Sequence, residues 1–370
     1  MGLVHSPEQK AFRQSLRTFF AKNSTEREVR RVMATAEGVD SEVWSKLNTE
    51  LGVAGLNIPE TYGGSGYTFE EIGIALEEAG RSLFCGPLLS SVVSSSTLLL
   101  TDDEEAKREL LPEIAAGTTI TTLALTNFPS KWDAQGATVS AVRSDPSWTL
   151  SGVAPYVLDG ASAAVLLVPA WSDAGVSLFA VNGDSGGVRR TTLPTLDQTR
   201  KLARVEFNYS PARLIGVEGA AGPLLVDALR VAAVALANEQ VGVAAAAMEM
   251  AVQYAKDRVQ FGRPIGSFQA IKHKCADLYV AVEGARSAAF MGAEAVAQKS
   301  PDLAEVAALA ASYCSETCLL TGHENIQIHG GIGFTWVHPA HLYYKRAKSS
   351  EFLFGDAKFH REHLAVEIGL

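Results

Sequence analysis

The spacing of apolar residues predicts helices in the first third of the chain. Apolar positions recur at helical intervals in residues 7–20 and again in 69–83. Residues 102–111 form another helical stretch, and its acidic start suits the positive end of a helix dipole. The glycine-rich segment 59–66 predicts a loop between the first two of these stretches.

The pattern changes at about Thr118. Short β-branched runs, separated by Gly, Pro, Asp and Asn, follow one another at the spacing of a small antiparallel barrel or sandwich. The predicted strands are 118–125, 137–142, 148–151, 164–168, 176–181 and 203–207.

Helical spacing returns after Pro211. An Ala-rich helix starts near Pro223, which suits a first helical turn, and runs to about Val259. It is apolar on most faces, so we expect it at the centre of a bundle or at a subunit interface. Further helices are predicted at 268–299 and 303–320. The fold class is therefore mainly α with a central β module.

We expect three domains from this order: an N-terminal helical domain at 1–117, a middle β domain at 118–212 and a C-terminal helical bundle at 213–370. A chain of 370 residues with 47% hydrophobic residues can fill such cores. The net charge of −9 argues against a nucleic-acid surface, which needs a clustered basic face. It does not exclude anionic ligands, because local fields and backbone N–H groups decide those contacts.

The four cysteines are too few and too scattered for a disulfide framework. Cys314 and Cys318 lie one helical turn apart, so a metal or redox pair is conceivable, but we expect buried thiols on an Ala-rich helix. The charged first helix is not a signal peptide, and the apolar window 231–251 contains polar residues that argue against a membrane span. A reducing cytoplasm fits these features.

Two segments near the C-terminus have the residues that a dinucleotide needs. They are RVQFGRPIGSFQAIKH at 258–273 and QIHGGIGF at 327–334. A pyrophosphate requires a fixed cation, and Arg258 offers several donors in one plane. It also requires close approach of the backbone, which Gly330 and Gly331 permit without steric penalty. The alternatives are a surface salt bridge and a simple turn. A nicotinamide site is excluded by the lack of a βαβ unit around these glycines.

Both segments resemble motifs of the acyl-CoA dehydrogenases, and PETYGG at 59–64 and LLP at 110–112 agree with that family. The resemblance implies an N-terminal helical domain, a middle β-barrel and a C-terminal four-helix bundle. It also implies FAD as the cofactor and an acyl-CoA thioester as the substrate. An electron-transfer flavoprotein becomes a candidate partner. No metal is expected.

By resemblance, one set of residues holds the ADP side of an FAD whose flavin ring lies in the neighbouring subunit, and such a site requires at least a dimer. This set is Arg258, Phe261, Gln269, Gln327, Gly330 and Gly331.

The catalytic base of the family is missing from its two usual places. Removal of a proton from Cα needs a carboxylate in a desolvated pocket. In most members of the family that this chain resembles, the base is a Glu directly before a Gly-Thr pair. The corresponding residue here is Phe354, which precedes Gly355 and Asp356. Other members have the Glu early in the long helix, where this chain has Ala232. The catalytic residue is therefore unknown.

Three other acids could replace the base. Glu239 lies on roughly the same helix face as Ala232, about 10 Å further along the axis. We favour a buried polar contact near a glycine-lined helix crossing for Glu239. For Glu351 and Asp356, which flank Phe354, we favour a solvated end of the chain.

The β module also departs from the family pattern. Members usually follow a strand ending in Thr-Glu-Pro with a small-residue loop that cradles the flavin, whereas residues 126–133 here read TNFPSKWD. A second flavin-facing strand usually presents Trp and Thr, and this chain has Tyr156 and Leu158. Tyr156 could stack on a ring or fill the barrel core.

Three hypotheses follow from the resemblance. The first is a subunit of an α2β2 acyl-CoA dehydrogenase, similar to bacterial assemblies in which two related chains share fewer flavins than subunits, some of them acting on steroid side-chain thioesters. The second is a homo-oligomer with Glu239 as a relocated base. The third is a non-catalytic acyl-CoA-binding or scaffold subunit.

Five histidines cluster late in the sequence, and for these we expect packing or surface roles because zinc spacing and acidic support are lacking. They are His329, His338, His341, His360 and His363.

Overall fold

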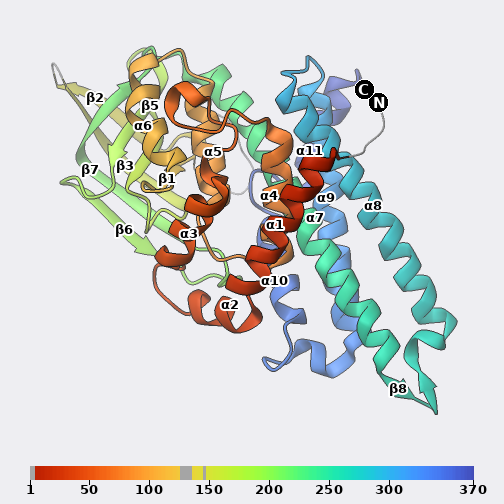
Figure 1. The fold of residues 1–370 in the computed structure, drawn as a ribbon. Coiled ribbons are helices and arrows are strands. Elements are labelled where there is room, and N and C mark those ends of the chain that lie inside the picture. Colours follow the sequence, from red (N-terminus) through yellow and green to blue (C-terminus); the bar gives the residue numbers. More distant parts are fainter. Residues whose placement is uncertain (1–4, 126–135, 145–146) are drawn as a thin grey trace. The chain divides into compact units, whose positions relative to one another are not determined.

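The computed structural model describes residues 5–125, 136–144 and 147–370 and confirms the helix–β–helix order (Figure 1). The chain forms two compact units. The helical unit comprises Met1–Arg31, Gly73–Phe84 and Ala233–Leu370, and the barrel unit comprises Val32–Ile72 and Cys85–Ala232. The three-domain division by sequence position stays a prediction.

Each predicted helix is present in the structure, and α9 extends past its predicted end. They are α1 (Pro7–Asn23), α2 (Glu26–Met33), α3 (Ser41–Leu51), α4 (Phe69–Arg81), α5 (Leu88–Leu99), α6 (Glu104–Ala115), α7 (Ala221–Asp257), α8 (Gln269–Ala297), α9 (Leu303–His329), α10 (Ala340–Ser350) and α11 (Ala357–Glu367).

The strands of the barrel unit include all six predicted runs and one further strand. They are β1 (Thr121–Leu123), β2 (Val139–Ser144), β3 (Ser147–Leu158), β4 (Val165–Ser172), β5 (Gly175–Asn182), β6 (Val188–Thr192) and β7 (Leu202–Ile215). The unpredicted strand, β6, pairs only with β7, and its side chains are exposed or half-buried. It therefore lacks the buried face whose alternation marks a strand in a sequence.

The sheet closes on itself as a barrel. The strand order β4-β2-β3-β7-β5 returns to β4 because β4 also pairs with β5. Most pairings are antiparallel as predicted, but β4 is parallel to β1 and, through Ser140 and Trp171, to β2. The side chains that point into the closed barrel pack in one apolar core. The ring centroids of Trp148 and Phe179 lie 5.3 Å apart in it.

Helix α5 of the barrel unit is buried on all sides although half of its residues are hydroxylic. Most of its hydroxyls bind backbone carbonyls of the preceding turn or groups of the barrel: Thr97 donates to the Val93 carbonyl at 2.7 Å, and Ser90 donates to Asp159 at 2.6 Å. Because no polar face alternates with an apolar one, α5 has no helical signal in the sequence.

Helices α7, α8 and α9 pack through small residues in the helical unit. Ala237, Ala285 and Ala310 belong to one buried cluster with Cys314, whose thiol donates to the Ala285 carbonyl at 3.3 Å. Burial raises the pKa of this thiol, and all four cysteines are free, which confirms the expectation of buried thiols for Cys314 and Cys318. Helices α7 and α9 are long and apolar enough to cross a membrane, but 94% of the apolar window of α7 is buried inside the protein, as in a core helix.

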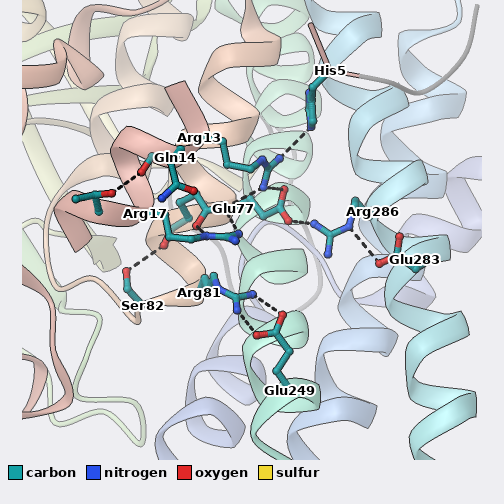
Figure 2. Close-up of polar contacts among 12 residues, drawn as sticks. His5, Arg13, Gln14, Arg17, Glu77, Arg81, Ser82, Glu249, Glu283 and Arg286 are labelled. Carbon is teal, nitrogen blue, oxygen red and sulfur yellow. Dashed lines mark hydrogen bonds and ion pairs between the residues drawn. The ribbon is translucent and has the colours of Figure 1, made fainter. Parts of the chain in front are cut away.

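An ionic network joins α1, α4 and α8 of the helical unit (Figure 2). Glu78 of α4 is buried and accepts hydrogen bonds from Arg13 at 3.0 Å and Arg17 at 2.8 Å, both on α1. Glu77 binds Arg13 as well as Arg286 of α8. Buried carboxylates are tolerated only with such partners, so the network fixes α1 and α8 against α4.

Two glycines let α4 and α7 touch backbone to backbone. A Cβ on Gly242 would lie 1.8 Å from the Glu77 carbonyl oxygen, and one on Gly80 would lie 2.2 Å from the Glu239 carbonyl oxygen. The predicted glycine-lined crossing beside Glu239 is therefore present.

Candidate functional site

The two C-terminal motifs meet at one end of the helical unit. Ile328 of α9 packs in one buried cluster with Ala251 and Ala255 of α7, and Ile271 and Cys275 of α8 pack against it. The segments that follow α7 and α9 therefore emerge side by side. These segments carry Arg258 and Gly330, so the structure brings the predicted cofactor residues to a common surface.

A hairpin projects Phe261 from this end. Strands β8 (Val259–Gln260) and β9 (Arg263–Pro264) pair in antiparallel register, and both loop residues, Phe261 and Gly262, have positive φ (52° and 77°). Positive φ at both central positions is typical of a type I′ hairpin turn, and a phenylalanine adopts it only at a cost. Phe261 is 92% exposed, and its ring makes an edge contact with the Phe268 ring at 6.1 Å between centroids.

The polar residues of the motifs are also free to bind. Arg258, Gln269 and Gln327 are exposed. Across the ranges that the structure describes, no hydrogen bond or ion pair holds the Arg258 guanidinium. By contrast, the guanidinium of Arg263 stacks on the Phe268 ring at 4.1 Å. Helix α8 begins at Gln269 without a side-chain cap, so the positive end of its dipole favours an anion there.

The glycine turn after α9 is open on its outer side. A short 3-10 helix, Gly330–Phe334, follows α9, and Gly330 has φ 65°. A Cβ on Gly330 or Gly331 would meet nothing within 4 Å. A ligand can therefore approach the backbone closely at both positions.

His329 lies directly beneath this turn. Its ring is buried, stacks on Tyr254 of α7 at 4.2 Å and lies 4.3 Å from the His338 ring. Burial lowers the pKa of His329, which keeps the ring neutral near pH 7. His341 also packs on an aromatic ring, that of Trp336, at 4.7 Å. The predicted packing role is thus confirmed for these histidines, and within the described ranges no cluster of His, Cys, Asp or Glu could hold a metal ion.

A phenylalanine occupies the turn where the resemblance places the base. Phe354 lies between α10 and α11, is 8% exposed and has φ 62°, and the next residue, Gly355, has φ 111°. The ring of His360 packs against this turn, since a Cβ on Gly355 would lie 3.0 Å from its Nε2 atom. Ala232, the other expected position, is fully buried. Neither position offers a proton acceptor.

The neighbouring acids are already engaged. Asp356 caps α11 by accepting from the Phe359 N–H at 2.7 Å, and Glu351 pairs with Lys348. Glu239 accepts from the Arg346 guanidinium at 2.8 Å, and both side chains are buried. The favoured interpretation of Glu239, a buried polar contact beside a helix crossing, agrees with this geometry.

In the barrel unit, the predicted loop departure at 126–133 lies outside the described residues. Tyr156 lies in the β-bulge between Ala154 and Val157 of β3 and is 53% exposed. The alternative that Tyr156 fills the barrel core is therefore wrong, because the bulge turns the ring outward. Leu158 is buried.

This fold and these two motifs define a helix–barrel–helix flavoprotein. Family models for the acyl-CoA dehydrogenase N-terminal and C-terminal domains match residues 6–118 and 223–369. The chain is 34% identical to acyl-CoA dehydrogenase IpdE2 of Mycobacterium tuberculosis, over 93% of this chain and 92% of the relative. It belongs to the acyl-CoA dehydrogenase family.

Solved structures agree over the whole chain. A steroid acyl-CoA dehydrogenase variant, Tcur3481-Tcur3483, is 30% identical with a TM-score of 0.88, covering 98% of this chain and 97% of that one. The ChsE4-ChsE5 complex from Mycobacterium tuberculosis is 27% identical with a TM-score of 0.90, covering 100% and 99%. Butyryl-CoA dehydrogenase of Megasphaera elsdenii, at 24% identity and a TM-score of 0.91, shares the fold.

The cofactor of this family of oxidoreductases is FAD, and the donor set described above fits its anionic part. A guanidinium with no partner among the described residues, two exposed amides, an uncapped helix start and an open glycine turn lie at one end of the helical unit. Together they offer charge and hydrogen-bond donors to a pyrophosphate and a surface for an adenosine.

Proposed function

We propose that this chain is a subunit of a heteromeric FAD-dependent acyl-CoA dehydrogenase, in which it contributes the ADP side of an FAD site across a subunit interface. Arg258, Gln269, Gln327 and the Gly330–Gly331 turn would bind the pyrophosphate and ADP ribose, with Phe261 inserted beside them. The base would come from a related partner chain. The observation that carries this proposal is the combination of an unpaired, exposed Arg258 with a buried Phe354 at the position of the base.

In the reaction, a base on the partner would remove the proton from Cα of the thioester, and FAD held at this site would supply the acceptor for the hydride of Cβ. The residues of this chain would bind the ADP part of FAD and orient the cofactor. Arg258 would supply a positive charge for the pyrophosphate. Gly330 and Gly331 have no side chain, so the cofactor could approach their backbone closely. Neither Phe354 nor Ala232 can hold the Cα proton, which is why the proposal assigns that step to the partner.

An exposed apolar surface supports the need for a partner. Phe261, Phe334, Trp336 and Val337 are all exposed in the same two segments. Exposed aromatic and aliphatic side chains of this kind are typical of a subunit interface. Similar structures include the ChsE4-ChsE5 complex and the steroid acyl-CoA dehydrogenase variant Tcur3481-Tcur3483. A related chain is therefore the proposed partner, and a steroid side-chain thioester is a proposed substrate. A cytoplasmic location is part of the proposal and suits four free thiols.

The test is co-expression of this chain with a paralogous chain from the same genome. We expect the complex to retain FAD with fewer flavins than subunits and to lose flavin absorbance when a fatty acyl-CoA or a steroid side-chain CoA thioester is added. The chain alone should be colourless or inactive. A yellow preparation of the chain alone that dehydrogenates as fast as the complex would instead support a homo-oligomer, and a flavin that no thioester reduces would support a non-catalytic subunit.

Substitution of Arg258 tests the site itself. Arg258→Gln in the complex should weaken FAD binding by about 10- to 100-fold, because a charge-assisted phosphate contact contributes roughly 1.5–3 kcal/mol. Arg361→Gln is the matched control, since Arg361 is another exposed arginine of the helical unit and pairs with Glu316. Equal FAD affinity in both variants would remove Arg258 from the site.

A further inference from the structure

The stack of Tyr254, His329 and His338 connects the two cofactor segments. The Arg258 N–H donates to the Tyr254 carbonyl at 2.8 Å, so Tyr254 lies one turn before the hairpin. His329 immediately precedes Gly330. Because the Tyr254 and His329 rings lie 4.2 Å apart at 29°, the stack ties the last turn of α7 to the last turn of α9.

The same ring contacts close the glycine loop. His329 precedes the loop and His338 follows it, and their ring centroids are 4.3 Å apart. His329 Nδ1 lies 2.8 Å from the Asn325 carbonyl, which can only accept, so Nδ1 carries the proton. His338 Nδ1 accepts from the Ala340 N–H at 3.2 Å. Each ring is therefore oriented by a backbone hydrogen bond.

The loop is also shaped to sit on His329. A Cβ on Gly333 would lie 2.8 Å from the His329 Cβ, so only a glycine allows this approach. Burial lowers the pKa of both His329 and His338, so the stack adds no positive charge to the site near neutral pH. What the stack supplies is rigidity, and a backbone site binds an anion well only when it is ordered before the ligand arrives.

We propose that Tyr254, His329 and His338 are positioning residues for FAD, which set the spacing between the Arg258 hairpin and the Gly330–Gly331 turn. The inference rests on the function proposed above. It assigns a role to residues that themselves need not touch the cofactor. The expected consequence is that loss of the stack weakens FAD binding while leaving the chemistry of bound flavin unchanged.

The experiment uses the co-purified complex with three changes in this chain. His329→Ala removes the ring, His329→Phe keeps a ring for stacking, and His323→Ala is the control, an exposed histidine on the same helix. The FAD dissociation constant should rise about tenfold in His329→Ala, since a ring contact and a hydrogen bond together are worth roughly that factor, and the phenylalanine should restore most of the affinity. The rate per bound flavin should be equal in all variants.

The outcomes separate the two proposals. If Arg258→Gln weakens FAD binding but His329→Ala does not, the positioning role is wrong and the proposed site stands. If His329→Phe binds FAD as weakly as His329→Ala, ring stacking is not the cause. If neither Arg258→Gln nor His329→Ala affects FAD, the site itself is misplaced. Should His329→Ala fail to fold, His338→Ala removes the other ring contact and answers the same question.

Discussion

Glu239 and Arg346 form a buried ion pair with 2.8 Å between Oε1 and Nη1. The guanidinium also donates to the Phe84 carbonyl at 3.4 Å, so the pair links α7 and α10 to the end of the α4 segment within the helical unit. A carboxylate that already accepts from a buried cation is a poor acceptor for a substrate proton. This relationship argues against Glu239 as a relocated base.

Glu239→Gln should therefore leave turnover and flavin content of the complex unchanged. The free energy of unfolding should fall by about 1–3 kcal/mol, because Arg346 keeps a hydrogen-bond acceptor but loses its counter-charge. Turnover with acyl-CoA and urea unfolding are the measurements. The control is Glu249→Gln. Glu249 lies on α7, like Glu239, and forms an exposed pair with Arg81 of α4, so its loss should cost less than about 1 kcal/mol. Loss of turnover with flavin still bound in Glu239→Gln would restore the relocated base.

Gly242→Ala should destabilise the helical unit. Alanine favours a helix over glycine by up to about 1 kcal/mol, but here its Cβ would collide with the Glu77 carbonyl and force α4 and α7 apart. We expect a net loss of about 1–3 kcal/mol by denaturant unfolding. Gly222→Ala, at the start of the same helix, meets no atom within 4 Å and should be neutral or stabilising. Equal effects of the two substitutions would contradict close packing at the crossing.

Glu78→Gln tests the ionic network of Figure 2. Glu78 binds Arg13 and Arg17 and is buried, so neutralising it leaves two guanidinium groups without their shared counter-charge. The cost should be about 3–5 kcal/mol, seen as a lower melting temperature and urea midpoint. In the control Glu283→Gln, the half-exposed pair with Arg286 is lost, and the stability should change by less than about 1 kcal/mol. A small effect at Glu78 would mean that water replaces the carboxylate.

The stability of the protein should fall as the pH is lowered from about 6.5 to about 4. Burial, assisted by the charge of His363, lowers the pKa of His360 to about 4 from its usual 6.5. Between these values the unfolded chain binds a proton that the folded chain does not, so acid favours unfolding. His360 contributes at most about 1.4 kcal/mol per pH unit. Urea unfolding across this range should show a shallower pH dependence in His360→Gln, and identical slopes would show that His360 is hydrated.

Sequence reasoning succeeded where a local pattern has one physical meaning. The helical period of 7–20 became α1, and β-branched runs became the barrel strands, because each buries one face. Helices α2, α3 and α10 were not predicted, and two further elements were missed for an identifiable reason, strand β6 and helix α5. The first has no buried face and the second has no exposed one, so neither produces an alternating pattern.

The sequence by itself determined the order of helices and strands, the family motifs and the absence of an acid at Phe354 and Ala232, because these depend on residue identity and spacing alone. Only the tertiary structure decided what surrounds each residue: that Glu239 is neutralised by Arg346, that Tyr156 turns outward in a bulge, and that His329 lies beneath the glycine turn. Such contacts join positions far apart in the chain, 107 residues for Glu239 and Arg346 and 262 residues for Phe84 and Arg346. No local spacing encodes them, since they arise from how whole helices and strands pack.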